Sequence, residues 1–107
     1  MNLIYPIENG WTIYSISKCE YCDKSKFFLE RLGEELNIIN VDDVMKNKYT
    51  RKEFLEHMFD LADMSIKYFP MIFKDKEYIG GYNDLIQYYS LNNYVIKNEI
   101  NVNSDEF

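Results

Sequence analysis

Apolar positions in the first half of the chain predict a strand, a helix and a second strand. A short β-like run from Trp11 to Ile16 follows a turn at Asn9-Gly10. A helix is predicted from about Tyr21 to Leu32, because small and apolar residues recur at helical spacing before Gly33 supplies a stop signal. Its inner face consists of Ser25, Phe28, Leu29 and Leu32. The second strand is predicted at Leu36 to Val41.

A polar segment and a second helix follow. Asn40-Val41-Asp42-Asp43 is predicted to lead the chain out of the second strand, and no helix is predicted there. Thr50 is the predicted N-cap of a helix that runs to about Ala62. Its inner face consists of Phe54, Leu55, Met58, Leu61 and Ala62.

The last third of the chain predicts a β-hairpin and a final helix. Strands at Pro70 to Lys74 and Glu77 to Ile79 are joined by a tight turn at Asp75-Lys76. Gly80-Gly81 ends the second of these strands, and the final helix is predicted to begin near Asn83.

The predicted order β-α-β-α-β-β-α describes a single α/β domain over residues 1–107. The first two strands should be parallel with a right-handed crossover, because a helix joins them, and the hairpin adds antiparallel strands. The result is a small four-stranded mixed sheet flanked by about three helices. Residues 1–10 are expected to be an N-terminal extension, and residues 98–107 a frayed tail.

The candidate chemistry lies in Cys19-Glu20-Tyr21-Cys22, which contains the only two cysteines of the chain. The predicted strand and helix on either side place Cys19 at a helix start, where unpaired backbone N–H groups and the helix dipole stabilise a thiolate. We therefore expect a lowered pKa for the Cys19 thiol, favoured by Lys18 and opposed by Glu20. A thiolate is the attacking species in disulfide exchange, so the motif indicates redox chemistry.

Two other uses of the cysteine pair are less well supported. A structural zinc site usually has four ligands, and the chain offers only His57 beside the pair, so carboxylates or a second chain would be needed. A structural disulfide across two intervening residues closes a short loop and removes little entropy from the unfolded chain. No metal site is predicted.

Composition and charge narrow the class of protein. The net charge of −6 argues against non-specific binding to nucleic acid and against attraction to anionic membranes. Apolar runs are only a few residues long, so no transmembrane span is predicted, and the N-terminus lacks the features of a secretion signal. We therefore expect a cytoplasmic protein, and in that reducing compartment a close cysteine pair is more often catalytic than structural.

Three separated motifs, at residues 13–22, 67–73 and 79–85, resemble those of the glutaredoxin family, which belongs to the thioredoxin-fold superfamily, and the cysteine pair resembles its dithiol type. Residues Ile13 to Cys22 are similar to the family's strand followed by Cys-Pro-Tyr-Cys. Lys67 to Phe73 resembles its Thr-Val-Pro strand, and Ile79 to Leu85 its Gly-Gly pair and polar helix start. The motifs occur in the family's order and cover most of the chain from Trp11 to about Tyr89. The resemblance implies a thioredoxin fold.

The resemblance also implies a role for each matching residue. Cys19 would be the nucleophile that attacks a glutathionylated substrate or a protein disulfide, and Cys22 the resolving thiol. A cis peptide bond would join Phe69 to Pro70, and the Phe69 backbone would pair with the cysteine of glutathione. The other residues that would bind glutathione or substrate are Lys18, Tyr21, Lys67, Gly81, Tyr82, Asn83 and Asp84.

Some of these roles follow the charges of glutathione. The start of the final helix would hold the γ-glutamyl end, since free N–H groups at a helix N-terminus bind carboxylates. Asp84 would pair with the glutathione ammonium group, and Lys67 would meet a glutathione carboxylate. Glutathione would be a co-substrate, and no bound cofactor is expected.

The chain departs from the family pattern at three positions. Glu20 replaces the usual proline, and Tyr68 the usual threonine. Ile16 occupies a position where many members keep a lysine for the glycine carboxylate of glutathione. Lys18, directly before the pair, resembles phage-type glutaredoxins, which reduce ribonucleotide reductase.

The predicted function is that of a monomeric thiol-disulfide oxidoreductase acting on protein disulfides, glutathione mixed disulfides or both, with ribonucleotide reductase as a candidate partner. Ile16 motivates one alternative, a thioredoxin-like electron donor recycled by thioredoxin reductase. A second alternative is an iron–sulfur carrier in which two monomers share a cluster through Cys19 and two glutathiones, which Cys22 and Glu20 disfavour. A third is an idle thioredoxin-fold binding module, which the presence of both cysteines disfavours.

Overall fold

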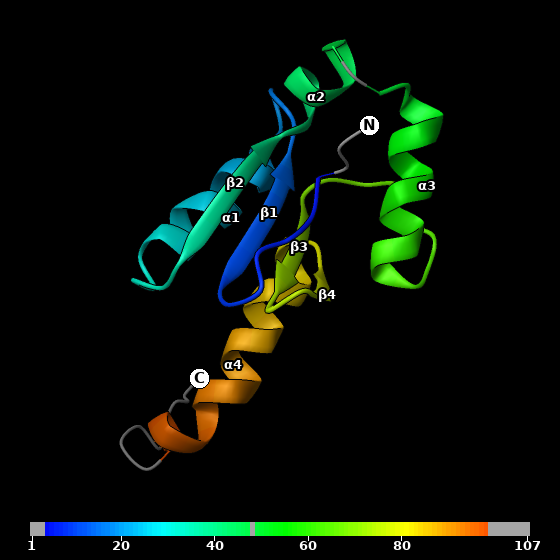
Figure 1. Ribbon diagram of the computed structural model, residues 1–107. Coiled ribbons are helices and arrows are strands. Elements are labelled where there is room, and N and C mark those ends of the chain that lie inside the picture. Colours follow the sequence, from blue (N-terminus) through cyan, green and yellow to red (C-terminus); the bar gives the residue numbers. More distant parts are fainter. Residues whose placement is uncertain (1–3, 48, 99–107) are drawn as a thin grey trace.

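The computed structural model describes residues 4–47 and 49–98 and contains a four-stranded sheet of order β2-β1-β3-β4 (Figure 1). β1 (Trp11–Ser15) pairs in parallel with β2 (Leu36–Asn40) and antiparallel with β3 (Met71–Lys74). β3 pairs antiparallel with β4 (Glu77–Gly80). The predicted mixed sheet is confirmed, and each predicted strand boundary lies within one residue of the observed one.

Four helices accompany the sheet within the described residues: α1 (Glu20–Glu30), α2 (Val41–Asn47), α3 (Arg51–Ala62) and α4 (Tyr82–Asn98). The predictions of α1, α3 and α4 are confirmed. Residues 99–107, most of the predicted tail, lie outside the described part of the chain, and Asn98 is the last residue of α4. Among the described residues, none of the helices has the length and apolar composition that a membrane span requires.

The short helix α2 was not predicted. Its start is stabilised by Asn40, whose Oδ1 accepts a hydrogen bond from the Asp42 amide at 3.0 Å. Asp42 and Asp43 lie in its first turn and Lys46 in its last, which suits the helix dipole. The helix has only seven residues, too few for an apolar period to reveal it, although Asn-x-Asp-Asp is a recognisable capping signal.

The start of α3 matches the sequence-based prediction. Thr50 Oγ1 accepts a hydrogen bond from the Glu53 amide at 3.1 Å, and Glu53 Oε1 accepts one from the Thr50 amide at 2.9 Å. This reciprocal pair is a capping box, which satisfies two N–H groups that the helix itself leaves unpaired.

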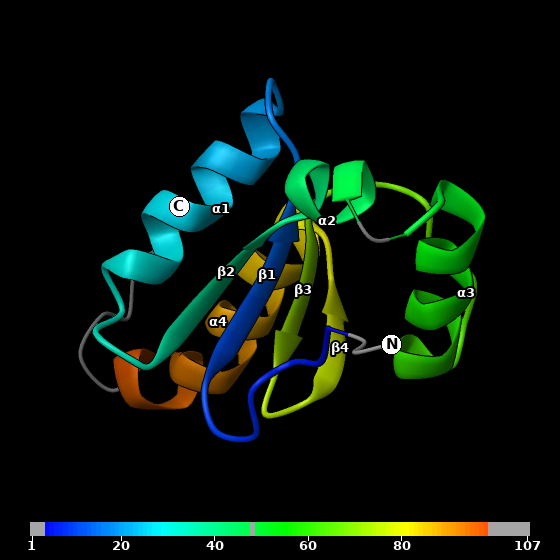
Figure 2. The same ribbon diagram turned by 45° about the horizontal axis from the view of Figure 1, so that its top comes forward.

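Alternate residues of β1 face two apolar layers. Ile13 packs in a cluster with Leu29 of α1 and Leu85 of α4, whereas Tyr14 packs with Phe54 and Met58 of α3. Helices α1 and α4 therefore cover one face of the sheet and α3 covers the other (Figure 2). All of β1 is buried, as expected for a strand covered on both faces.

Strand directions bring the three sequence motifs together. β1 ends where α1 begins, β3 runs antiparallel to β1 and so begins at the same end of the sheet, and β4 returns to that end before α4 starts. The turn before α1, the loop before β3 and the turn before α4 therefore meet at one end of the sheet, the usual location of sites in open α/β sheets.

Candidate functional site

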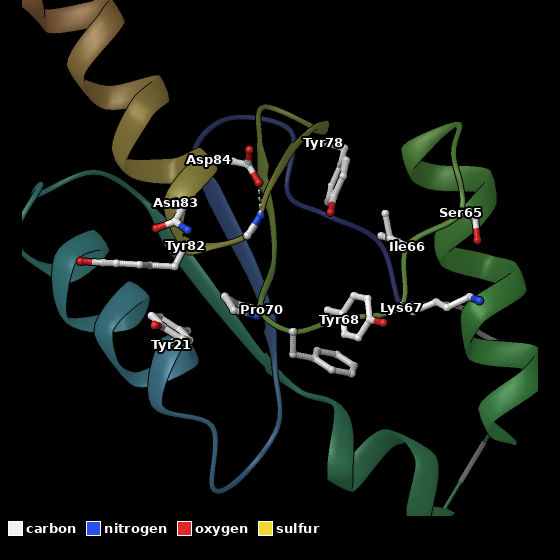
Figure 3. Close-up of a pocket in the computed structure, with 12 residues that line it drawn as sticks. Tyr21, Ser65, Ile66, Lys67, Tyr68, Pro70, Tyr78, Tyr82, Asn83 and Asp84 are labelled. Atoms are coloured by element: carbon white, nitrogen blue, oxygen red, sulfur yellow. Dashed lines mark hydrogen bonds between the residues drawn. The ribbon is translucent and has the colours of Figure 1, made fainter.

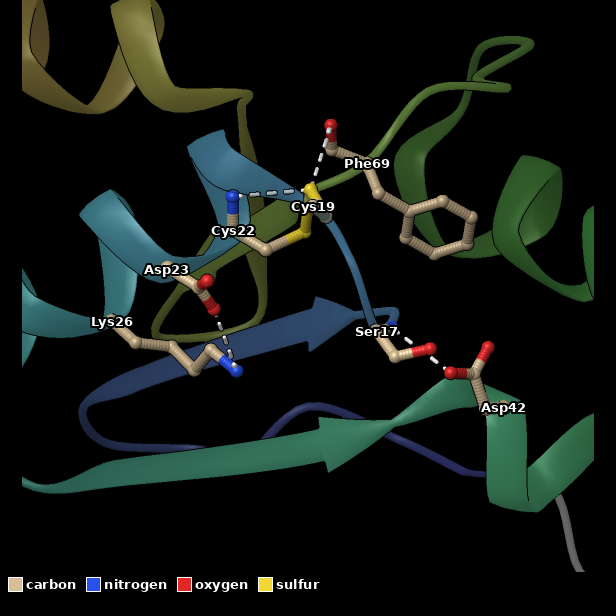
Figure 4. The surroundings of a disulfide bond; sticks show 7 residues. All are labelled: Ser17, Cys19, Cys22, Asp23, Lys26, Asp42 and Phe69. Atoms are coloured by element: carbon tan, nitrogen blue, oxygen red, sulfur yellow. Dashed lines mark hydrogen bonds and ion pairs between the residues drawn. A yellow bond between two sulfur atoms is a disulfide. The ribbon is translucent and has the colours of Figure 1, made fainter.

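Cys19 and Cys22 form a disulfide at the start of α1 (Figure 4). Cys19 is the N-cap residue, with an extended backbone, and its Sγ accepts a hydrogen bond from the Cys22 amide at 3.1 Å. Cys19 is half-buried and Cys22 is fully buried. An incoming substrate can therefore approach the sulfur of Cys19, whereas Cys22 can be reached only from within the protein.

The charges that flank the pair are not equivalent. Glu20 is exposed and forms an ion pair with Lys24 at 3.3 Å, one helical turn further along α1. The effect of Glu20 on the nearby sulfur is thus partly offset by a cation. Lys18 is exposed and has a positive φ of 54°, in the left-handed region that few non-glycine residues adopt.

The loop before Cys19 is held by α2. The Ser17 amide donates a hydrogen bond to Asp42 Oδ2 at 2.9 Å (Figure 4). The Ser17 side chain, together with this backbone N–H, keeps the pKa of Asp42 below its usual range. Sequence reasoning did not identify Asp42 as part of the site, because α2, which carries it, was not predicted.

Asp42→Asn is expected to lower the urea midpoint of unfolding near neutral pH, modestly because the carboxylate is exposed. A carboxyl group whose pKa is lower in the folded than in the unfolded state stabilises the fold above its unfolded pKa, and that contribution disappears as the pH falls through the folded pKa. The difference in urea midpoint between wild type and variant should therefore shrink as the pH falls below the normal range of carboxyl pKa values. Ser17→Ala should reproduce part of the loss seen near neutral pH. A difference that does not depend on pH would contradict the role given to the Asp42 charge.

The predicted cis peptide bond between Phe69 and Pro70 is confirmed. The Phe69 carbonyl oxygen lies 4.0 Å from Cys19 Sγ (Figure 4). Pro70 is buried. The Phe69 ring stacks on Phe54 of α3 with centroids 6.1 Å apart. The loop before β3 is thus packed against α3 on one side and reaches the cysteine pair on the other.

A cavity of about 480 Å³ lies between the start of α1, the loop before β3 and the start of α4 (Figure 3). Neither cysteine lines it, although Tyr21, which lies between them in the sequence, does. Most of the predicted binding residues line it. They are Tyr21 from α1, Lys67, Phe69 and Pro70 from the loop before β3, and Gly81, Tyr82, Asn83 and Asp84 from the start of α4. Lys18 is not among the lining residues. The cavity also includes Ser65, Ile66, Tyr68 and Tyr78, to which no binding role was given.

Aromatic side chains form much of the rim of the cavity. The Tyr21 and Tyr82 rings lie 5.7 Å apart, so they join α1 to the start of α4. Tyr68 is 84% exposed, directly before the Phe69-Pro70 bond. Tyr78 is half-buried, and this burial, with the nearby Asp84 charge, raises the pKa of its phenol. Tyr78 therefore remains a neutral hydrogen-bonding group at physiological pH.

Asp84 has a structural role in addition to its predicted one. Its Oδ2 accepts a hydrogen bond from the Gly81 amide at 2.9 Å and so stabilises the first turn of α4 (Figure 3). Gly80, just before this turn, has a φ of 131°, and a side chain there would collide with Asp84. Only glycine fits that position without strain.

The cavity carries opposite charges at its two sides. Figure 3 shows Lys67 on the side of α3 and Asp84 at the start of α4. His57, the only histidine, packs instead beside the Ile4 carbonyl oxygen and the Tyr5 ring. Among the described residues, no group of three or more His, Cys, Asp or Glu side chains is placed to hold a metal ion.

Several solved structures are similar to this chain. Glutaredoxin 1 from Francisella tularensis, complexed with cacodylate, is 25% identical, with a TM-score of 0.61 over 81% of this chain and 96% of its own. Reduced Escherichia coli glutaredoxin is 24% identical, with a TM-score of 0.61 over 77% of this chain and 94% of its own. A buckwheat glutaredoxin-glutathione complex is 18% identical, with a TM-score of 0.63 over 81% and 74%. These likenesses support the thioredoxin fold.

The family is established by the sequence comparison. No curated protein sequence matches the chain. The family model described as Glutaredoxin matches residues 11–79, well over half of the chain, and that match includes the cysteine pair, the cis proline and all but the last residue of the final hairpin. Since the pair also forms a disulfide at an accessible helix start, the chain belongs to the glutaredoxin family of thiol-disulfide oxidoreductases.

Proposed function

We propose that this protein is a dithiol glutaredoxin that reduces protein disulfides and glutathione mixed disulfides, with glutathione as its co-substrate. The main supporting observation is the unequal exposure of the cysteine pair. The half-buried Cys19 is bonded to the fully buried Cys22. The Phe69 carbonyl oxygen lies 4.0 Å from Cys19 Sγ, and Phe69 lines a cavity that carries opposite charges. This arrangement suits a pair in which one sulfur meets the substrate and the other resolves the intermediate.

The proposed reaction transfers two electrons to the substrate disulfide. The Cys19 thiolate attacks one substrate sulfur, a mixed disulfide forms, and the first substrate thiolate leaves and takes up a proton. Cys22 then loses its proton and attacks Cys19 Sγ, which releases the second substrate thiol. The pair is left as the disulfide found in the structure. Two glutathione thiols subsequently reduce it and leave as oxidised glutathione.

The use of glutathione is supported by the charges of the cavity. Glutathione carries two carboxylates and one ammonium group, and the cavity presents Lys67, the start of α4 and Asp84. Free N–H groups at a helix start favour a carboxylate. Asp84 keeps one carboxylate oxygen beyond the one that accepts from Gly81, and this oxygen is available to an ammonium group. The buckwheat relative, which is complexed with glutathione, adds support.

A second candidate is an electron donor that thioredoxin reductase recycles instead of glutathione. It is favoured by Ile16, which is half-buried and packs against the apolar cluster of β1 and α3. No cation is therefore available at that position for the glycine carboxylate of glutathione.

We further propose ribonucleotide reductase as a disulfide substrate, on the basis of Lys18 and its resemblance to phage-type glutaredoxins. We also propose that the protein acts as a monomer in the cytoplasm, where the thiol pool would keep the pair reduced between turnovers. Reduction of oxidised ribonucleotide reductase by stoichiometric dithiol protein would test the choice of partner.

Turnover of a glutathione mixed disulfide, coupled to NADPH oxidation, tests the choice of electron donor. We expect activity with glutathione and glutathione reductase, and little with thioredoxin reductase alone. Activity only with thioredoxin reductase would favour the second candidate.

Lys67→Gln should raise the KM for the glutathione mixed disulfide about two- to fivefold, the range for an exposed ion pair. Lys76→Gln, at the exposed turn between β3 and β4, should leave the KM unchanged.

A further inference from the structure

The buried row of α1 contains one polar residue. The buried residues of this helix are Cys22, Ser25 and Leu29, whose spacing of three and four residues puts them on one face. Ser25 has no exposed surface, and its hydroxyl has no hydrogen-bond partner among the described residues. An unpaired buried hydroxyl is costly, and such groups are rare enough in folded proteins that each one calls for an explanation.

The neighbours of Ser25 on this face indicate what could pair with it. On its C-terminal side lies Leu29, within the apolar cluster that also contains Ile13 and Leu85. On its N-terminal side lies Cys22, one turn away. Side chains of a helix lean toward its N-terminus, so the Ser25 side chain lies over the turn that begins at Cys22. Cys22, through its sulfur, is therefore the only other buried side chain of the row that can form a hydrogen bond.

In the oxidised protein the Cys22 sulfur is bonded to Cys19 at the helix start, so it is not free to turn toward Ser25. Reduction of the pair takes up two electrons and two protons and breaks the S–S bond. It leaves a thiol on Cys22 in a fully buried position. Such a thiol also needs a hydrogen-bond partner, and its side chain is then free to rotate toward the next turn.

We propose that the Ser25 hydroxyl is the hydrogen-bond partner of the Cys22 sulfur in the reduced protein. Reduction thus gives the hydroxyl a partner, and oxidation removes it. Ser25 therefore shifts the equilibrium of the cysteine pair toward the dithiol. The inference rests on the proposed dithiol cycle, and adds to it a residue that sets how strongly the pair acts as a reductant.

The redox equilibrium of Ser25→Ala tests this inference. Wild type and variant are equilibrated with mixtures of reduced and oxidised dithiothreitol, and the fraction of free cysteine is measured after acid quenching and alkylation. We expect the variant to favour the disulfide about three- to tenfold more than wild type, from the usual net strength of one hydrogen bond. A tenfold change corresponds to a potential about 30 mV more negative.

A matched pair of variants separates the hydroxyl from packing. Ser25→Thr keeps the hydroxyl, and Ser25→Val replaces it with a methyl group in a side chain of the same shape. The valine variant should therefore favour the disulfide more strongly than the threonine variant does. Unfolding gives an independent readout, because Ser25→Ala should stabilise the oxidised form and destabilise the reduced form. A purely structural role would move both forms in the same direction.

An unchanged redox equilibrium in Ser25→Ala, or equal values for the threonine and valine variants, would overturn the inference. This result is distinct from a failure of the proposed function. A protein that equilibrates with dithiothreitol but does not turn over glutathione mixed disulfides would refute the proposed use of glutathione, while the comparison of Ser25 variants would remain decisive for the hydroxyl.

Discussion

Cys19→Ser is expected to reduce disulfide exchange to the background rate, whereas Cys22→Ser should retain exchange with glutathionylated substrates and lose the reduction of protein disulfides. Only Cys19 has a sulfur that an external substrate can approach, and the Cys22 amide that donates to it is retained in both variants. A serine hydroxyl is far less ionised than a thiol at neutral pH and cannot replace the thiolate as a nucleophile.

The measurement is turnover of a glutathionylated peptide and, separately, reduction of a protein disulfide. Both variants lack the disulfide, so their unfolding midpoints should match that of the reduced wild type, which serves as the control for folding. If Cys22→Ser were the inactive variant and Cys19→Ser retained monothiol exchange, the assignment of nucleophile and resolving thiol would be reversed.

Phe73→Ala is expected to lower the free energy of unfolding by about 3–5 kcal/mol, the usual range for removing a buried aromatic ring. Phe73 lies on β3 with no exposed surface, and its ring lies 5.5 Å from that of Tyr14 and 5.3 Å from that of Tyr78. The cavity left behind would lie inside the apolar layer between the sheet and α3. A loss of this size is a large share of the 5–15 kcal/mol typical of a folded domain.

Urea unfolding of the reduced protein measures this loss without a contribution from the disulfide. Phe27→Ala on α1 is the matched control, because its ring is 60% exposed and its removal should cost less than about 1 kcal/mol. Equal losses for the two variants would show that the layer around Phe73 does not carry the stability assigned to it.

The sequence predicted well those features that depend on neighbours along the chain. The four strands, the cap at Thr50 and the helix start at the cysteine pair were all placed close to their observed positions. Period, capping and turn signals are local, so they can be read without knowing the fold. The match to known glutaredoxin motifs added the cis bond before Pro70, which no local pattern would have revealed.

Features that depend on packing were beyond the reach of the sequence. Helix α2 was missed because it is too short for a period, and with it the hydrogen bond from Ser17 to Asp42. Lys18 was expected to help bind glutathione, a role that no observation tests, and it does not line the cavity. Ser25 was predicted only as part of the inner face of α1, and nothing in the sequence showed that its hydroxyl lacks a partner.

The sequence by itself determined that two cysteines lie about one turn apart at the start of a helix, because their separation along the chain and the helix-start signals are both local. It also placed the apolar residues that build the sheet. Only the tertiary structure decided that Cys19 is accessible while Cys22 is buried, and that Phe69 and Asp84 reach the same end of the sheet. The burial of Cys22 and the meeting of Phe69 and Asp84 at one end of the sheet arise only when segments distant in the sequence pack together.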